Sequence, residues 1–164
     1  MNDVRLRAAT RDDMPAALEL VKELAAYENA PQEVTVTADD YVTDGFDSNL
    51  FKCIVAELQG EVVGMCLYYP RYSTWKGRTI HLEDFIVKQK YRQHGIGKKL
   101  FDAVVKAAQD FGAKRLEWAV LEWNKPALNF YDKINAEYDK EWFLAQLREQ
   151  QIKDYTFGDQ PSDL

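Results

Sequence analysis

The chain has 164 residues, 46% of them apolar and 29% charged, so its length suits one domain and its composition excludes a disordered or low-complexity protein. Its formal net charge of −6 repels nucleic-acid phosphates, and we expect no nucleic-acid partner. No apolar run reaches the roughly 20 residues of a membrane span, and the N-terminus lacks the features of a secretory signal. We therefore expect a cytoplasmic protein with no membrane partner.

The first third of the chain predicts one strand and two helices, over residues 4–8, 10–28 and 37–44. Thr10 followed by Asp13 has the spacing of a capping box, and apolar residues then recur at helical spacing. Gly45 is expected to end the second helix, because glycine readily takes the left-handed conformation at a helix C-terminus.

The next segment predicts a β-hairpin. Residues 51–58 and 61–70 are rich in β-branched and aromatic side chains and flank the tight turn Gln59-Gly60. In the register of a two-residue turn, Cys53 faces Cys66 across the strand pair. Two cysteines cannot form a disulfide framework, and we expect them to be reduced thiols in the core.

The second half of the chain alternates strands and helices. The expected elements are a loop over 72–77, a strand over 78–87, a helix over 95–111, a strand over 115–121 and a short helix capped by Asn124. The segment 141–155 predicts a strand over about 142–147 and then a helix, although its helix formers also fit a helix throughout. Residues 158–164 are expected to be frayed. The order β-α-α-β-β-β-α-β-α-β predicts a single mixed α/β domain over residues 1–164, with its core at about 4–147.

The segment Arg92-Gln93-His94-Gly95-Ile96-Gly97-Lys98-Lys99 lies between a predicted strand and a predicted helix. Its glycines let the backbone approach a ligand, and the N–H groups of a helix N-terminus bind anions, so the segment predicts a phosphate cradle. A Walker loop and a dinucleotide fingerprint both fail, because the glycines and the hydroxyl residue that they need are missing. An Arg-x-x-Gly-x-Gly pattern remains, and the alternative is an ordinary strand-to-helix turn.

The surroundings of this loop carry a resemblance. Together with residues 82–87, 123–131, 27–28 and 72–75, it resembles the spermidine/spermine (diamine) N-acetyltransferase family within the GNAT superfamily, over roughly residues 4–147. The resemblance implies a single GNAT-type α/β domain with a mixed twisted sheet flanked by helices. It also implies acetyl-CoA as co-substrate, a homodimer, and direct attack of an amine on the thioester.

The resemblance assigns two catalytic residues and a coenzyme site. Tyr131 matches the family's general acid, and Glu83 matches the residue that contacts the amine and relays its proton through water. The strand backbone at 85–87 would face the pantetheine and thioester, and Gln93 to Lys98 would hold the pyrophosphate. The residues implied to bind the coenzyme are Phe85, Ile86, Val87, Arg92, Gln93, His94, Gly95, Ile96, Gly97, Lys98, Asn124, Lys125, Pro126 and Ala127.

An acidic and aromatic wall is implied for the acceptor amine. For Tyr27-Glu28 the alternative is a solvated surface, and for Trp75 it is a packing anchor. The residues implied to line the acceptor site are Tyr27, Glu28, Trp75, Glu83, Glu117, Trp118, Ala119 and Glu141. No metal is expected, because the chain's two histidines, His81 and His94, form no ligand cluster with its two cysteines.

Three positions depart from the polyamine branch of the family. Gln93 replaces a loop glycine, which is harmless if its φ is negative, and Asn135 replaces a helix-ending glycine. Ser73-Thr74 stands where polyamine acetylators have Asp-Pro, and it resembles the sister branch that acetylates thialysine and related lysine-like amino acids. We therefore expect a small cationic acceptor of that kind. The alternatives are a spermidine/spermine acetyltransferase, a protein lysine acetyltransferase and a CoA-binding module without turnover.

Overall fold

The computed structural model describes residues 3–157, and they divide into two compact units between Ala119 and Val120. The first unit holds a five-stranded sheet in the order β1-β2-β3-β4-β5. Its first four strands are antiparallel neighbours and β5 is parallel to β4. The predicted mixed sheet is thereby confirmed. The strands are β1 (Arg5–Ala8), β2 (Lys52–Leu58), β3 (Glu61–Ser73), β4 (Gly77–Val87) and β5 (Arg115–Glu117).

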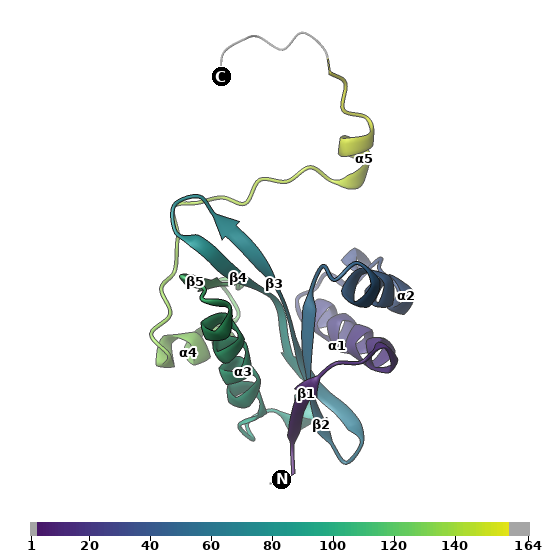
Figure 1. Cartoon of the computed structure of the whole chain (residues 1–164), viewed down its shortest axis with the longest axis vertical. Coiled ribbons are helices and arrows are strands. Elements are labelled where there is room, and N and C mark those ends of the chain that lie inside the picture. Colours follow the sequence, from purple (N-terminus) through teal and green to yellow (C-terminus); the bar gives the residue numbers. More distant parts are fainter. Residues whose placement is uncertain (1–2, 158–164) are drawn as a thin grey trace. The chain divides into compact units, whose positions relative to one another are not determined.

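Helices cover both faces of this sheet (Figure 1). Helices α1 (Met14–Tyr27) and α2 (Ala38–Val42) lie on one face and α3 (Ile96–Phe111) lies on the other. Burial of apolar area of this kind is the main stabilising term for such a layered domain. The core on the α1 side includes Met14, Leu20, Val55, Met65 and Leu67.

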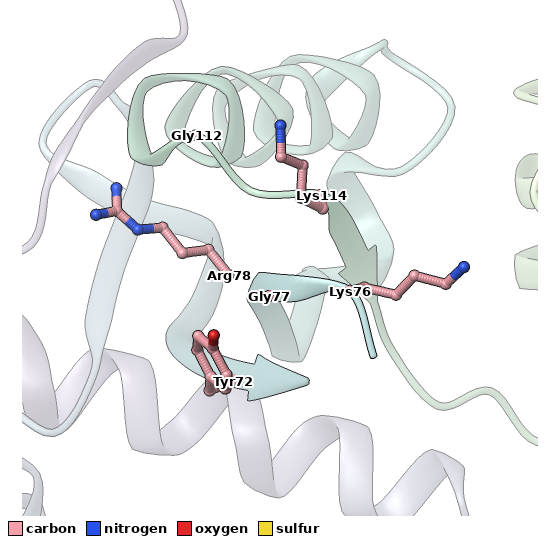
Figure 2. A pocket seen from close by; sticks show the side chains of 6 residues that line it. All are labelled: Tyr72, Lys76, Gly77, Arg78, Gly112 and Lys114. Carbon is pink, nitrogen blue, oxygen red and sulfur yellow. The ribbon is translucent and has the colours of Figure 1, made fainter. Parts of the chain in front are cut away.

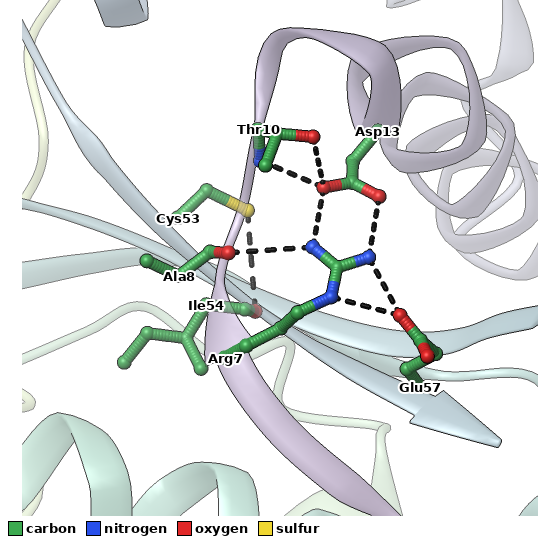
Figure 3. A network of polar contacts seen from close by, with 7 residues as sticks. All are labelled: Arg7, Ala8, Thr10, Asp13, Cys53, Ile54 and Glu57. Atoms are coloured by element: carbon green, nitrogen blue, oxygen red, sulfur yellow. Dashed lines mark hydrogen bonds and ion pairs between the residues drawn. The ribbon is translucent and has the colours of Figure 1, made fainter. Parts of the chain in front are cut away.

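The predicted capping box of Thr10 and Asp13 is present, but it opens a 3-10 turn over Arg11–Asp13, and α1 begins after it at Met14. The box is part of a larger polar cluster (Figure 3). Asp13 accepts hydrogen bonds from the backbone N–H of Thr10 at 2.7 Å and from its hydroxyl at 2.8 Å. Arg7 of β1 donates two more to the same carboxylate, at 2.6 and 2.9 Å, and its Nε donates to Glu57 of β2 at 2.8 Å. This cluster ties the first helix to two strands.

The second helix does not end at Gly45, so that prediction was wrong. A π-helical turn over Thr43–Asp47 continues α2, with the N–H of Ser48 donating to the carbonyl of Thr43 at 2.8 Å. A Cβ built on Gly45 would lie 2.7 Å from the ring of Phe51. The glycine therefore serves close packing of that ring and not helix termination.

The predicted pairing of Cys53 with Cys66 was also wrong. A register shift at Ala56 and Glu57 places Cys53 opposite Leu67 and Cys66 opposite Ile54. Because a one-residue shift moves a side chain to the other face of a sheet, the two thiols lie on opposite faces. Both cysteines are buried and free, and burial raises the pKa of the Cys53 thiol to about 12.

The β3–β4 hairpin is longer than predicted, and β5 is shorter. Ser73 and Gly77 pair with each other, so the connecting turn covers only residues 74–76 and the predicted loop over 72–77 was too long. The Ser73 hydroxyl accepts hydrogen bonds from the N–H groups of Trp75 and Lys76, and these bonds hold the turn in a tight conformation. Strand β5 pairs with β4 only at residues 79–81, so it ends at Glu117 instead of residue 121.

The second unit holds α4 (Lys125–Lys133) and α5 (Glu149–Lys153). The Asn124 side chain caps α4 as predicted, accepting from the N–H of Ala127, and Asn135 has a φ of 56° after the helix. The strand predicted over 142–147 is absent, because no neighbouring strand pairs with this segment within residues 3–157. The frayed end predicted for 158–164 lies outside the described residues. The helices in the described part of the chain are all too short or too polar to cross a membrane.

Candidate functional site

The free edge of β4 is the centre of the candidate site. Since β5 pairs only with residues 79–81, the stretch from Leu82 to Val87 has a paired strand, β3, on one side only within the described residues. The β3–β4 register also shifts between Leu67 and Tyr68, which leaves Glu83 as an extra residue without a partner. A bulge of this kind bends a strand and redirects side chains. The backbone at Phe85, Ile86 and Val87 is thus available to a ligand.

The loop after β4 leads into a helix N-terminus that has no side-chain cap. Gln93 and Gly95 both have left-handed φ, at 65° and 78°, and no side chain caps the first turn of α3. Thr37 and Asn124, by contrast, cap α2 and α4. The N–H groups of the first α3 turn therefore remain available to an anion. The condition set for Gln93, a negative φ, is not met.

No protein atom would clash with a side-chain Cβ at Gly97. A Cβ built there meets only ordinary contacts, at 3.5 Å from the Phe85 ring and 3.9 Å from Val87. Glycine in the first turns of a helix costs roughly 1 kcal/mol relative to alanine. The fold itself therefore gives no reason for glycine at this position, whereas a ligand lying against the backbone does.

Arg92 holds the loop in place and does not point freely into it. Its Nε donates to the carbonyl of Val87 at 2.8 Å, and its guanidinium lies 5.6 Å from the ring centroid of Tyr27. One of its Nη atoms is 3.9 Å from Glu23 of α1. The arginine thus fixes the loop to the end of β4 and to α1. His94 and Lys98 also have partners, the carbonyl of Arg92 and the carboxylate of Asp102.

Two surface cavities flank α3 at opposite ends. One, of about 430 Å³, lies beside the loop and is lined by Glu23, Lys88, Gln89 and Lys90. The other, of about 340 Å³, lies at the C-terminal end of the helix (Figure 2). A 16-residue helix is about 24 Å long, so the second cavity is separate from the loop. Figure 2 shows that its cationic side chains diverge, and the residues that line it are Tyr72, Lys76, Gly77, Arg78, Gly112 and Lys114.

Acidic side chains gather at the bulge of β4. Glu83 accepts a hydrogen bond from the Tyr69 hydroxyl at 2.8 Å. Its neighbour Asp84, which the sequence analysis missed, is partly buried, and burial, with repulsion from Glu83 and Glu28, raises the pKa of its carboxyl to about 6. Burial also raises the pKa of Glu28. The sequence signal for Asp84 was an acidic residue inside an apolar strand, which is costly unless it has a use.

The other predicted acceptor residues have different surroundings. Trp75 lies in the β3–β4 turn and is 81% exposed; six residues of strand separate it from Glu83, or roughly 20 Å. The Trp118 ring packs edge-on against Phe101 at 5.4 Å, and Ala119 is exposed. The structure therefore does not bring Trp75 to Glu83 within one chain. Glu117 binds two arginines and is described further below.

The remaining predicted residues belong to the second unit. Tyr131 is buried, and burial raises the pKa of its phenol to about 12, so the hydroxyl keeps its proton at neutral pH. Asn124 caps the helix that carries Tyr131, and Lys125, Pro126 and Ala127 form its first turn. Glu141 is exposed, with its N–H donating to Asp139. This unit therefore presents a phenol that can donate a proton.

Comparisons with known proteins give the family and the fold of the chain. The Acetyltransferase (GNAT) family matches residues 14–136. A thialysine N-epsilon-acetyltransferase of Bos taurus is 42% identical over 143 residues, which cover 82% of this chain and 84% of the relative. The spermidine/spermine N(1)-acetyltransferase-like protein 1 of Homo sapiens is 32% identical over 165 residues, covering 94% of this chain and 24% of that protein. A solved aminoglycoside acetyltransferase from an uncultured soil metagenomic sample, in complex with trehalose, shares the fold, with a TM-score of 0.74 at 21% identity, covering 90% of this chain and 98% of that one.

Proposed function

The chain belongs to the acetyltransferase (GNAT) family, and from that premise we propose that it transfers the acetyl group of acetyl-CoA to a primary amine of a small, lysine-like cationic acceptor such as thialysine. The observation that carries the proposal is the group of carboxyl side chains at the β4 bulge, next to the free strand edge and the uncapped start of α3. The relatives named thialysine N-epsilon-acetyltransferase support this acceptor.

The residues present fit acetyl-CoA, because the first α3 turn offers uncapped N–H groups to phosphate and Gly97 leaves the backbone open to it. In this proposal Gln93 to Lys98 hold the pyrophosphate, and the backbone of residues 85–87 pairs with the pantetheine arm. The family resemblance also assigns Asn124, which caps α4, to the coenzyme site. When bound, acetyl-CoA supplies the activated acyl group.

In this proposal the carboxyl side chains at the β4 bulge, Glu28, Glu83 and Asp84, select the cationic amine and accept its proton. Neutralising a primary ammonium at pH 7 costs about 4–5 kcal/mol, so a nearby acceptor for its proton is needed. Glu83 is oriented by Tyr69, and Asp84, with its pKa raised to about 6, exchanges protons close to neutral pH, which suits this task. Tyr131 keeps its proton and donates it to the departing thiolate.

The acidic group also favours a second candidate, a spermidine/spermine acetyltransferase, since a polycation would gain from Glu28, Glu83 and Asp84 together. The Ser73-Thr74 pair argues against a polyamine acceptor, but it can act on the acceptor directly only across a dimer. Ser73 shapes the hairpin turn in this chain, about 20 Å along the strand from Glu83, so a direct effect on the acceptor would come from the turn of a second subunit.

A homodimer and a cytoplasmic location belong to the same proposal. Trp142, Phe143 and Leu144 are 70%, 97% and 90% exposed, and consecutive apolar side chains of this kind are typical of an interaction surface. A second copy pairing with this segment would give it the strand neighbour that it lacks here. Light scattering of the protein and of Phe143→Ser tests the dimer; equal masses would remove this segment from the interface.

The proposed function is tested by measuring CoA release from acetyl-CoA with thialysine, lysine, putrescine, spermidine and spermine. We expect thialysine to give the highest kcat/KM. Glu83→Gln should lower it about 100-fold, whereas Asp110→Asn, which alters an exposed carboxylate paired with Lys106, should not change it. Preference for spermidine would favour the second candidate. Binding of acetyl-CoA without any turnover would favour a non-catalytic CoA-binding module.

A further inference from the structure

His81 of β4 is a partly buried histidine to which the proposed mechanism gives no task. Its side chain is 20% exposed, and its Nδ1 atom is buried without a hydrogen-bond partner among residues 3–157. Buried polar atoms are rarely left unsatisfied in folded proteins, and an exception calls for an explanation in strain or function.

The two ring nitrogens of His81 each face a carboxylate. Nε2 lies 3.5 Å from Oε2 of Glu83, and Nδ1 lies 3.6 Å from Oε1 of Glu117. These distances are slightly too long for hydrogen bonds, yet catalytic contacts often shorten when the substrate binds. The imidazole therefore stands between the residue proposed to take the amine proton and a second acidic residue.

Tyr69 fixes the first half of this arrangement. Its ring stacks on the His81 ring, with centroids 5.2 Å apart and planes at 29°. Its hydroxyl donates to Oε2 of Glu83 at 2.8 Å, the same oxygen that faces His81 Nε2. One side chain thus orients both the imidazole and the carboxylate.

Two arginines fix the second half. Arg71 Nη1 donates to Oε1 of Glu117 at 2.6 Å, and Arg115 Nε lies 2.7 Å from Oε2. Glu117 is therefore held rigidly against the Nδ1 side of the imidazole. For Nε2 to accept a proton from Glu83, the neutral imidazole must carry its own proton on Nδ1, next to Glu117.

Resting on the proposed function, we propose that His81 holds the proton that the acceptor amine gives up, with Glu83 as the carrier between them. The N–H bond of the substrate ammonium breaks and its electron pair stays on nitrogen as the nucleophile. The proton passes to Glu83, directly or through water, and then to His81 Nε2. The imidazolium formed has two N–H donors facing two carboxylates. An imidazole holds a proton at neutral pH better than a carboxylate does.

The charged and titratable groups around His81 come from three strands. They are Tyr69 and Arg71 on β3, Glu83 on β4, and Arg115 and Glu117 on β5. The two arginines balance the two carboxylates in formal charge, so the transferred proton gives this cluster one positive charge until it leaves. Loss of the imidazole should therefore slow turnover most where the free amine is scarce, below the amine's own pKa of about 10.

The test is His81→Phe, which keeps an aromatic ring to stack on Tyr69 and keeps the buried volume. We expect kcat/KM for the amine to fall about 100-fold at pH 7 and no more than about threefold at pH 10, with KM for acetyl-CoA unchanged. Ile80→Val, a mild core change at the adjacent buried residue of the same strand, should leave the pH profile unaltered. A His81→Phe profile that coincides with the wild type would overturn the proposal.

A second readout does not depend on activity. Nitrogen NMR of the imidazoles reports which ring atom carries the proton, and the chain's other histidine, His94, is assigned with the His94→Gln variant. We expect the neutral imidazole of His81 to carry its proton on Nδ1, and a proton on Nε2 instead would overturn the proposal. A wild-type protein inactive on every amine would count against the proposed function. The NMR measurement would still show which nitrogen of His81 carries the proton.

Discussion

Asp13 and Asp84 are both shielded acidic residues of the first unit, but the groups around them have opposite charges. Asp13 lies against the Arg7 guanidinium and accepts four hydrogen bonds (Figure 3), and Arg7 holds the pKa of its carboxyl well below its usual range. Asp84 lies near Glu83 and Glu28, and its pKa is raised to about 6. The first carboxylate stabilises the fold, while the second is held at a cost that a cationic ligand would offset.

The largest effect on stability is expected at the Arg7–Asp13 pair. Asp13→Asn removes a buried charge partner of Arg7, so the free energy of unfolding at pH 7 should fall by about 3 kcal/mol in urea denaturation. Because the pKa of Asp13 is lowered in the folded state, its contribution is complete above about pH 4 and is lost as the pH falls further. The exposed pair Arg11–Asp47 is the matched control, and Asp47→Asn should lower the free energy of unfolding far less, because solvent screens an exposed ion pair. Equal losses would remove the distinction between the two pairs.

The opposite sign is expected at Asp84. Its folded-state pKa of about 6 exceeds the ordinary value of 3.8, so the folded state binds more protons between these values and stability falls as the pH rises from about 4 to 6. Asp84→Asn abolishes that fall and should raise the free energy of unfolding at pH 7 by about 2 kcal/mol. Amine acetylation should drop at the same time. A variant that is less stable at pH 7 would show that the carboxylate is favourably paired.

The smallest effect on stability is expected at Gly97, which belongs to neither the surroundings of Asp13 nor those of Asp84. Gly97→Ala should stabilise the protein by up to about 1 kcal/mol, because alanine favours the helix and its Cβ meets only ordinary contacts. Calorimetric titration should show weaker binding of acetyl-CoA, since the methyl group lies where the phosphate would approach. Unchanged affinity would mean that the pyrophosphate does not lie over this turn.

Local sequence patterns predicted much of this protein. The Thr10–Asp13 and Asn124 caps, the hairpin at Gln59-Gly60 and the helix closed by Gly112 depend on neighbouring residues, and all are present. The glycine loop was predicted in the same way, from a basic, glycine-containing turn, whereas Glu83 was proposed through the family resemblance. Asp84 carried a local signal, an acidic residue in an apolar strand, that was not used, whereas His81 was missed because its significance depends on Tyr69 and Glu117, which are distant in the sequence.

What the sequence determined by itself is therefore the order of elements, the caps and turns between them, and the family resemblance that those segments carry. Only the tertiary structure decided the strand register. One extra residue in β3, Val63, put the two cysteines on opposite faces, and one in β4, Glu83, has no cross-strand partner and lies beside a free strand edge. A shift of a single residue reverses the face of each side chain beyond it. Such shifts arise from packing between strands and helices far apart in the chain, so local periodicity carries no record of them.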